Sequence, residues 1–189
     1  MSENKIKFYL NDKEVLANQD ETIWQVANRL GTEIPHLCYA NKPGYRADGN
    51  CRACMVEIEG ERVLAASCIR KPTNNMKVNT SSQKAKKSRE LVFELLLSDQ
   101  PARDISHDND SKFWNWIDKI EIEESRFPKK TPCQSDTSHP SMAVNLDACI
   151  QCNLCVRACR EVQVNDVIGM AYRGENSKIV FDFDDPMGD

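Results

Sequence analysis

Nine cysteines among 189 residues constrain this chain more than any other feature of its sequence. Eight of them fall into two groups, and Cys133 stands apart. The first group comprises Cys38, Cys51, Cys54 and Cys68, and the second comprises Cys149, Cys152, Cys155 and Cys159. An odd count fits poorly with a fully paired disulfide framework, and clustered thiols in a reducing compartment are more often metal ligands or redox groups. The sequence therefore predicts a fold organised around thiol-rich sites.

Composition is that of an ordinary globular protein of one or two domains, with 40% hydrophobic residues, 29% charged residues and a net charge of −4. The mild acidity argues against a nucleic-acid surface, because affinity for nucleic acid comes largely from Lys and Arg. No stretch approaches the roughly 18 apolar residues of a membrane span, and the first residues lack the apolar core of a secretion signal. We therefore expect a cytoplasmic protein without a membrane span.

The first part of the chain has the pattern of a small α+β unit. Alternating apolar residues predict a hairpin over residues 5–18 and a second hairpin over residues 56–66. Between them, apolar residues at i, i+3, i+4 and i+7 predict a helix over residues 23–30, capped by Thr22 or Asp20.

Two apolar stripes predict helices in the next region. The first stripe, on a helix beginning near Gln83, comprises Leu91, Val92, Leu95 and Leu96, and the second comprises Phe113, Trp114, Ile117 and Ile120. We interpret the second stripe as a packing face, with contact to a partner subunit as the alternative. Prolines among Ser and Thr then indicate a linker. The expected divisions are residues 1–80, a helical connector at 81–126, the linker at 127–141 and a cysteine-containing domain at 142–189.

The spacing within the first cysteine group favours a 2Fe-2S cluster. Only Cys51 and Cys54 form a tight pair, whereas zinc sites of four cysteines usually combine two tight pairs. Gly44, Gly49 and Ala53 would let the backbone curl around the sulfurs, so that N–H groups donate to them and help set the reduction potential.

Three further side chains flank this group. Arg46 and Arg52 would place positive charge near an anionic cluster. His36 is adjacent to Leu37 and Cys38, but four thiolates already suffice, so we expect it to make hydrogen bonds rather than to bind iron.

The second group has three cysteines at three-residue steps and a fourth soon after, a pattern with high specificity. It predicts that Cys149, Cys152 and Cys155 bind three corners of a 4Fe-4S cluster, while a fourth cysteine in the following helix typically serves a different cluster. Tetrahedral zinc sites do not normally use such a run. A second arrangement would use Cys133 or Cys159 as the fourth ligand of a single cluster.

Two segments around the first group carry a resemblance to a known family. They are Pro35-His36-Leu37-Cys38-Tyr39 and Gly49-Asn50-Cys51-Arg52-Ala53-Cys54-Met55-Val56-Glu57. They resemble the 2Fe-2S domain that opens the large iron-sulfur subunit of respiratory NADH dehydrogenase. The same domain opens the alpha subunit of NAD-dependent formate dehydrogenases and a subunit of NAD-reducing hydrogenases. The resemblance implies a β-grasp ferredoxin fold over about residues 4–80.

The second group most closely resembles the alpha subunit of formate dehydrogenases. The likeness extends from Asn145-Leu146-Asp147-Ala148-Cys149 through Gly169-Met170-Ala171-Tyr172-Arg173-Gly174. In that family similar sequence continues into a second run of cysteines that exchanges ligands with the first. We therefore expect the N-terminal part of a longer subunit, with a truncated 4Fe-4S domain and with Cys159 serving a second cluster.

The connector departs from this family. Many relatives carry there a 4Fe-4S site built from one His and three Cys, whereas this chain has no cysteine between Cys68 and Cys133. We therefore expect that site to be missing, and His107 and His139 to be solvent-facing loop residues.

No nucleophile with its base, phosphate-cradling glycine loop or paired carboxylates are evident, so no catalytic residue is expected. The resemblance implies an electron relay in a molybdenum-dependent formate dehydrogenase, with a molybdenum catalytic domain and a flavin/NAD subunit as partners. The alternatives are a subunit of NADH dehydrogenase or NAD-reducing hydrogenase, a free-standing carrier, and a metal-stapled interaction scaffold. The expected fold class is α+β: a β-grasp 2Fe-2S ferredoxin-like domain, then helices and a partial bacterial-type 4Fe-4S ferredoxin domain.

Overall fold

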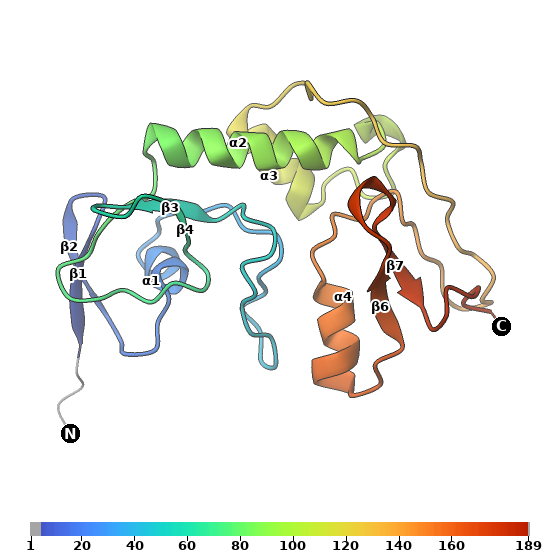
Figure 1. Cartoon of the computed structure of the whole chain (residues 1–189), viewed down its shortest axis with the longest axis horizontal. Coiled ribbons are helices and arrows are strands. Elements are labelled where there is room, and N and C mark those ends of the chain that lie inside the picture. The colour runs from blue at the N-terminus through green and yellow to red at the C-terminus, as the bar shows by residue number, and fades with distance from the viewer. Residues whose placement is uncertain (1–4, 189) are drawn as a thin grey trace. The chain divides into compact units, whose positions relative to one another are not determined.

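The computed structural model describes residues 5–188 (Figure 1). The chain forms two compact units. The first contains the described residues up to Tyr39 together with Ala47–Val92, and the second contains Ala40–Arg46 together with the described residues from Phe93 onward. None of the helices in the described part of the chain has the length and apolar character of a membrane span.

A five-stranded sheet in the order β2-β1-β5-β3-β4 organises the first unit. Its strands are β1 Ile6–Leu10, β2 Lys13–Ala17, β3 Met55–Ile58, β4 Ala65–Ala66 and β5 Lys77–Asn79. β1 and β2 pair antiparallel through a two-residue turn in which Asn11 and Asp12 both have positive φ, the conformation that matches strand twist. β3 and β4 also pair antiparallel, so both expected hairpins are confirmed.

The strand β5 joins the two hairpins and was not expected. It pairs parallel to β1 and antiparallel to β3. Its Val78 is buried, and the strand is only three residues long. Alternation over three residues gives no usable period, so the sequence pattern could not reveal it.

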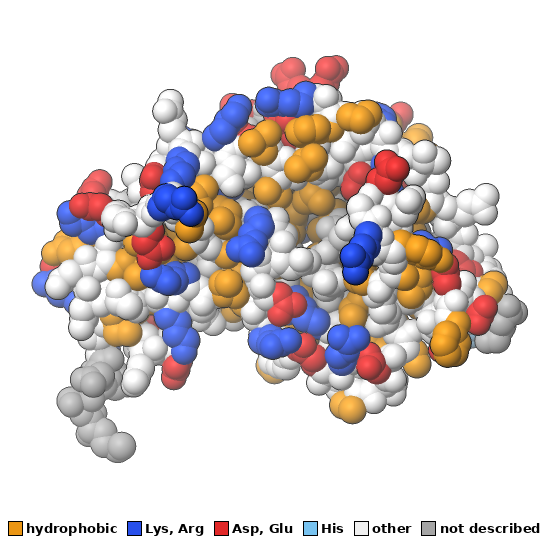
Figure 2. All heavy atoms as spheres, viewed as in Figure 1, with side chains coloured by type: hydrophobic (Ala, Val, Ile, Leu, Met, Phe, Trp, Pro, Cys, Tyr) orange, Lys and Arg blue, Asp and Glu red, His pale blue; other side chains and the backbone are white. Residues whose placement is uncertain are grey.

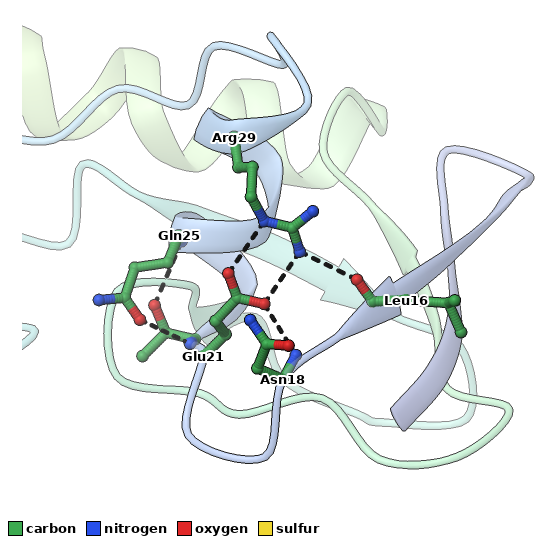
Figure 3. Close-up of polar contacts among 6 residues, drawn as sticks. Leu16, Asn18, Glu21, Gln25 and Arg29 are labelled. Carbon is green, nitrogen blue, oxygen red and sulfur yellow. Dashed lines mark hydrogen bonds and ion pairs between the residues drawn. The ribbon is translucent and has the colours of Figure 1, made fainter. Parts of the chain in front are cut away.

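The helix α1, Ile23–Arg29, packs its apolar face into the core of the first unit. Thr22 caps it: its hydroxyl accepts from Gln25 N–H while the Gln25 side chain accepts from Thr22 N–H. Arg29 in the last turn donates to Glu21 and to the carbonyl of Leu16 in β2 (Figure 3). These bonds fix the helix relative to the β1–β2 hairpin.

The long helix α2, Gln83–Ser98, contributes to both units. The expectation that Leu95 lies on its packing stripe was wrong, because the Leu95 side chain is 49% exposed. Ala85, Arg89 and Phe93 are buried instead. The buried face includes an arginine, which an apolar count does not detect, and is therefore displaced from the predicted stripe.

The second unit opens with the C-terminal part of α2 and the short helix η1, Arg103–Ile105. The helix α3, Lys112–Ile120, follows, capped by the Ser111 hydroxyl. Its Phe113, Trp114 and Ile117 are buried, which confirms the packing face, and the Phe113 ring stacks on Phe93 with centroids 6.1 Å apart. Residues 127–141 lack helices and strands except for one bridge of Asp136 to Val144.

The end of the second unit is a short helix followed by a hairpin. α4 spans Leu154–Arg157 and continues into η2, Ala158–Gln163. The antiparallel strands β6, Ile168–Ala171, and β7, Lys178–Phe181, enclose η3, Gly174–Asn176. Ile179 and Val180 in β7 are buried. The helix was expected from the cysteine run, whereas this hairpin was not.

Charges of both signs are interspersed on the face of the molecule that Figure 2 shows. Lys and Arg side chains lie beside Asp and Glu side chains there, with hydrophobic side chains between them. This distribution agrees with the mild net charge and gives that face no continuous basic surface for phosphates.

Candidate functional site

The four cysteines of the first group lie together in the first unit. Cys38 lies in the loop after α1, Cys51 and Cys54 lie in the loop leading to β3, and Cys68 follows β4. Cys38, Cys54 and Cys68 are buried, and Cys51 is partly exposed. The fold thus brings together four thiols that are spread over 31 residues of the sequence (Cys38 to Cys68, inclusive).

The thiols form two pairs. Cys38 N–H donates to the Cys51 sulfur at 3.5 Å, Cys51 N–H donates to the Cys38 sulfur at 3.3 Å, and the two thiols are hydrogen-bonded to each other. Cys54 and Cys68 form the second pair through a hydrogen bond between their thiols. Cys68 lies close enough to Cys38 and Cys51 for both to raise the pKa of its thiol, so the two pairs form one site.

Within each pair, one thiol donates a hydrogen bond and the sulfur of the other accepts it. This hydrogen bond is the largest cause that raises the pKa of Cys38 and of Cys68, and burial is the second. The same bond lowers the pKa of Cys51 to about 5 and that of Cys54 to about 7. Each pair therefore presents one thiolate near neutral pH, which is the form that binds metal, and metal binding would release the second proton.

Two pairs of thiols fit a two-iron cluster better than a single ion. A zinc site needs four ligands around one centre, whereas a 2Fe-2S cluster takes two thiolates on each of two irons. The arrangement of Cys38 with Cys51 and of Cys54 with Cys68 matches the second requirement.

The backbone between the cysteines turns sharply at two residues. Arg52 has a φ of 57° and Gly49 a φ of 62°, both in the left-handed region. A Cβ on Gly49 would lie 3.0 Å from Cδ1 of Ile69 and 3.4 Å from Cβ of Ala66. Both its backbone angle and its closeness to Ile69 and Ala66 therefore favour glycine at position 49.

The other residues expected near this group have distinct roles. The His36 ring packs edge-on against Trp24 with centroids 4.4 Å apart, and its Nδ1 lies 3.2 Å from the carbonyl oxygen of Ile34. Gly44 and Arg46, by contrast, belong to the second unit. Gly44 approaches Val162 there.

Three cysteines of the second group interact in the loop that leads into α4. The Cys149 thiol interacts with Cys152, and the Cys155 thiol interacts with both. Partial loss of water around the sulfur is the main cause that raises the pKa of Cys149, which is half-buried, and of Cys155, which is still exposed. Gln151 and Asn153 have positive φ, and Gln151 N–H donates to the Cys149 sulfur at 3.4 Å. These features fit a cluster-binding turn.

The two remaining cysteines of the second unit lie in different surroundings. Cys159 is buried in η2, and its sulfur accepts from Val167 N–H at 3.3 Å. Cys133 lines the same small cavity as Cys149, and its N–H donates to Asp147. The structure therefore brings Cys133 close to the second group, which its sequence position alone did not show.

The two loop histidines differ in exposure. His107 is exposed, as expected. His139 is half-buried, and its Nδ1 accepts from Ser141 N–H at 3.1 Å within the same loop. His139 was also expected to face solvent, and it does so only in part.

Comparison with known families bears directly on the first unit. A family model described as a 2Fe-2S iron-sulfur cluster binding domain matches residues 3–83. The first part of the chain is a 2Fe-2S ferredoxin-like domain. The match covers the sheet, α1 and all four cysteines of the first group. The expected ferredoxin-like fold is thus confirmed for this domain.

Several relatives are similar over most of the chain. A subunit of the NADH-quinone oxidoreductase of Rickettsia felis is 27% identical over 184 residues, which are 92% of this chain and 26% of the relative. The NADP-reducing hydrogenase subunit HndD of Solidesulfovibrio fructosivorans is 32% identical over 172 residues, which are 87% of this chain and 29% of the relative. The chain thus spans about a quarter of the length of these relatives.

A solved structure supports the fold beyond the ferredoxin-like domain. A chain in the crystal structure of an NAD+-reducing [NiFe]-hydrogenase in the H2-reduced state superposes with a TM-score of 0.83 at 25% identity. The match covers 93% of this chain and 74% of that chain.

Proposed function

We propose that this chain transfers electrons through iron-sulfur clusters within a larger NAD-linked oxidoreductase. The observation that carries the proposal is the pairing of four largely buried thiols in a 2Fe-2S ferredoxin-like domain. Cys38 and Cys51 would hold one iron, and Cys54 and Cys68 the other. When bound, such a cluster supplies reversible one-electron chemistry.

The residues of the chain would tune that chemistry through burial and hydrogen bonds. The N–H groups of Cys38 and Cys51 already point at sulfur, and such donors stabilise negative charge on a reduced cluster. Cys54 and Cys68 are themselves buried, which keeps water away from their sulfurs. The domain would thus hold the electron in a shielded, preorganised site.

A second cluster is proposed for the second unit. Cys149, Cys152 and Cys155 would bind three corners of a 4Fe-4S cluster, supported by their mutual interactions and the positive φ of Gln151 and Asn153. Cys159, with its separate hydrogen bond from Val167, would serve another cluster. Cys133 remains the alternative fourth ligand, because it lies beside Cys149.

The enzyme that we propose for this relay is a molybdenum-dependent formate dehydrogenase. The support is the likeness of the Asn145–Gly174 segment to the alpha subunits of that family. The partners would be a molybdenum catalytic domain, which oxidises formate, and a flavin subunit, which reduces NAD. The relatives named above favour a second candidate, an NADH dehydrogenase or an NAD-reducing hydrogenase.

Metal analysis with EPR tests the electron-transfer proposal on the chain itself. We expect iron and acid-labile sulfide, and a 2Fe-2S signal that appears on reduction and disappears on reoxidation. Cys51→Ser should remove that signal, whereas Cys133→Ser, in the other unit, should leave it intact. A colourless protein that contains zinc would instead establish the metal-stapled scaffold.

Two cysteine variants examine the second cluster. Cys152→Ser should remove any 4Fe-4S signal while the 2Fe-2S signal persists. Loss of the 4Fe-4S signal in Cys133→Ser would make Cys133 the fourth ligand, and its retention would assign that role to another group.

The choice of enzyme can be tested on the complex isolated with its native partners. Formate added without oxygen should reduce the 2Fe-2S cluster, and the complex should contain molybdenum. Reduction by hydrogen but not formate would identify a hydrogenase, and reduction by NADH alone, without molybdenum, would favour an NADH dehydrogenase.

A further inference from the structure

The segment Ala40–Arg46 lies between two proposed 2Fe-2S ligands but belongs to the second unit. In sequence it follows Cys38 by two residues and precedes Cys51 by five. Its neighbours within the second unit are α4 and η2, the helical segment that carries Cys155 and Cys159. Residues 40–46, between two proposed 2Fe-2S ligands, are thus held by the helical segment that carries Cys155 and Cys159, two proposed 4Fe-4S ligands.

Arg157 makes the central contact with this loop. Its side chain is 5% exposed, although arginine is rarely buried without partners. Its Nη1 donates to the main-chain carbonyl oxygen of Arg46. Its guanidinium also lies 5.9 Å from the ring centroid of Tyr45, within the range of a cation–π interaction.

Two further contacts flank Arg157. An ion pair joins Arg46 to Glu161 at 3.3 Å, and its arginine side chain is 74% exposed. Because exposed ion pairs contribute little, this one orients the loop more than it stabilises it. Gly44, with a φ of 83°, approaches Val162 so closely that a Cβ would lie 3.2 Å from Cγ2.

These contacts have an order of strength. A charge-assisted hydrogen bond from a buried guanidinium to a carbonyl is stronger than an exposed ion pair, and its loss would free the Arg46 carbonyl from the helical segment. Arg157 is also two residues from both Cys155 and Cys159. Of the three contacts between this helical segment and residues 40–46, the one made by Arg157 is therefore the strongest.

We propose that Arg157 is a positioning residue for the 2Fe-2S ligand loop. It acts through Tyr45 and Arg46 and, along the chain, fixes the approach to Cys51. Its role in tuning the 2Fe-2S cluster rests on the electron-transfer function proposed above, whereas its hold on the loop does not. The electron step itself forms and breaks no bond: one electron leaves the donor cluster and reduces the acceptor.

The test compares Arg157→Gln with Arg160→Gln in the full chain. Arg160 is a matched control, because it lies on the same helical segment, carries the same charge and makes an exposed ion pair with Asp166 at 2.8 Å. Hydrogen exchange should accelerate at least about tenfold for amides of residues 40–46 in Arg157→Gln, the factor expected on loss of one charge-assisted hydrogen bond. It should change little in Arg160→Gln.

A second readout is the midpoint potential of the 2Fe-2S cluster. It should shift more in Arg157→Gln than in Arg160→Gln, since both lose one positive charge but only the first releases the loop. Arg157→Lys, which retains a donor and a charge, should restore part of the loop protection. Equal potentials in the two glutamine variants, with unchanged exchange in residues 40–46, would overturn the proposal.

Tyr45→Leu keeps the proposal testable if Arg157→Gln fails to fold. It removes the ring beneath the guanidinium from the loop side and leaves α4 unchanged. We expect faster exchange in residues 40–46, and protection equal to that of the parent chain would count against the role of Arg157. Absence of any iron cluster with altered loop exchange would refute the electron-transfer function while retaining the loop anchor.

Discussion

Arg89, on α2, donates from Nε and Nη2 to the main-chain carbonyl oxygen of Met55, at 3.0 and 2.6 Å. Met55 directly follows Cys54, and the Arg89 side chain is 8% exposed. Burial lowers the pKa of Arg89, and the neighbouring Cys54 partly offsets this. The helix that continues into the second unit thus holds the backbone next to a candidate ligand of the first.

Arg89→Gln should destabilise the first unit by about 2–3 kcal/mol, because two hydrogen bonds from a buried guanidinium to a partly buried carbonyl are lost. Urea unfolding followed by circular dichroism measures the change. Lys86→Gln, at an exposed position on the same helix, should stay within about 0.5 kcal/mol of the parent. Equal effects of the two substitutions would show that Arg89 contributes only charge.

Glu21→Gln should weaken the first unit at neutral pH but not in acid. The Glu21 carboxylate accepts from Arg29 Nε and Nη2 and from Asn18 N–H (Figure 3). The hydrogen bonds from Arg29 lower its pKa, so its contribution is present above the unfolded value of about 4.3 and is lost as pH falls through the lower folded value. We expect a difference of about 0.5–1 kcal/mol at pH 7 that is lost as the pH falls below the folded pKa of Glu21.

The measurement is urea unfolding of both proteins across that pH range. A difference that stays constant with pH would mean that the substitution acts through packing, and the ion pair with Arg29 would then carry no pH dependence.

Gly49→Ala should cost more than Gly60→Ala. Both glycines have positive φ, of 62° and 82°, so alanine is strained at each by about 1–2 kcal/mol. A Cβ at Gly60 would meet open space, whereas one at Gly49 would meet Ile69 at 3.0 Å. The excess cost at Gly49, read from thermal unfolding, isolates this contact, and we expect a lower iron content as well. Equal costs would show that Ile69 moves aside freely.

Removal of iron by a chelator should lower the thermal midpoint of the first unit by several degrees, because bound metal stabilises only the folded state. Differential scanning calorimetry checks this. In Cys51→Ser the chelator should have little further effect. An unchanged thermal midpoint in the parent chain would show that bound metal does not stabilise this unit.

Local patterns predicted much of the first unit. The hairpins, α1 and its Thr22 cap follow from alternation, helical period and capping chemistry, all of which act over a few residues. β5 escaped prediction because its three residues are ordered by strands far away in sequence. The buried face of α2 was misplaced because a buried Arg89 substitutes for an apolar residue there.

The candidate sites show the same division. The spacing of the cysteines located both groups, but not which thiols pair, because pairing depends on how the loops fold back. The proximity of Cys133 to Cys149 and the contact of Gly44 with Val162 join residues from separate segments, and spacing carries no signal for either.

The chain leaves the first unit at Ala40 and returns at Ala47. Cutting the chain after the ferredoxin-like domain would therefore separate residues 40–46 from the rest of the unit to which they belong. A fragment ending near residue 80 would keep all four cysteines of the first group but lose the helical surface that receives residues 40–46. Transplanting this domain into another redox protein would therefore require either grafting the α4 surface with it or redesigning the loop between Cys38 and Cys51.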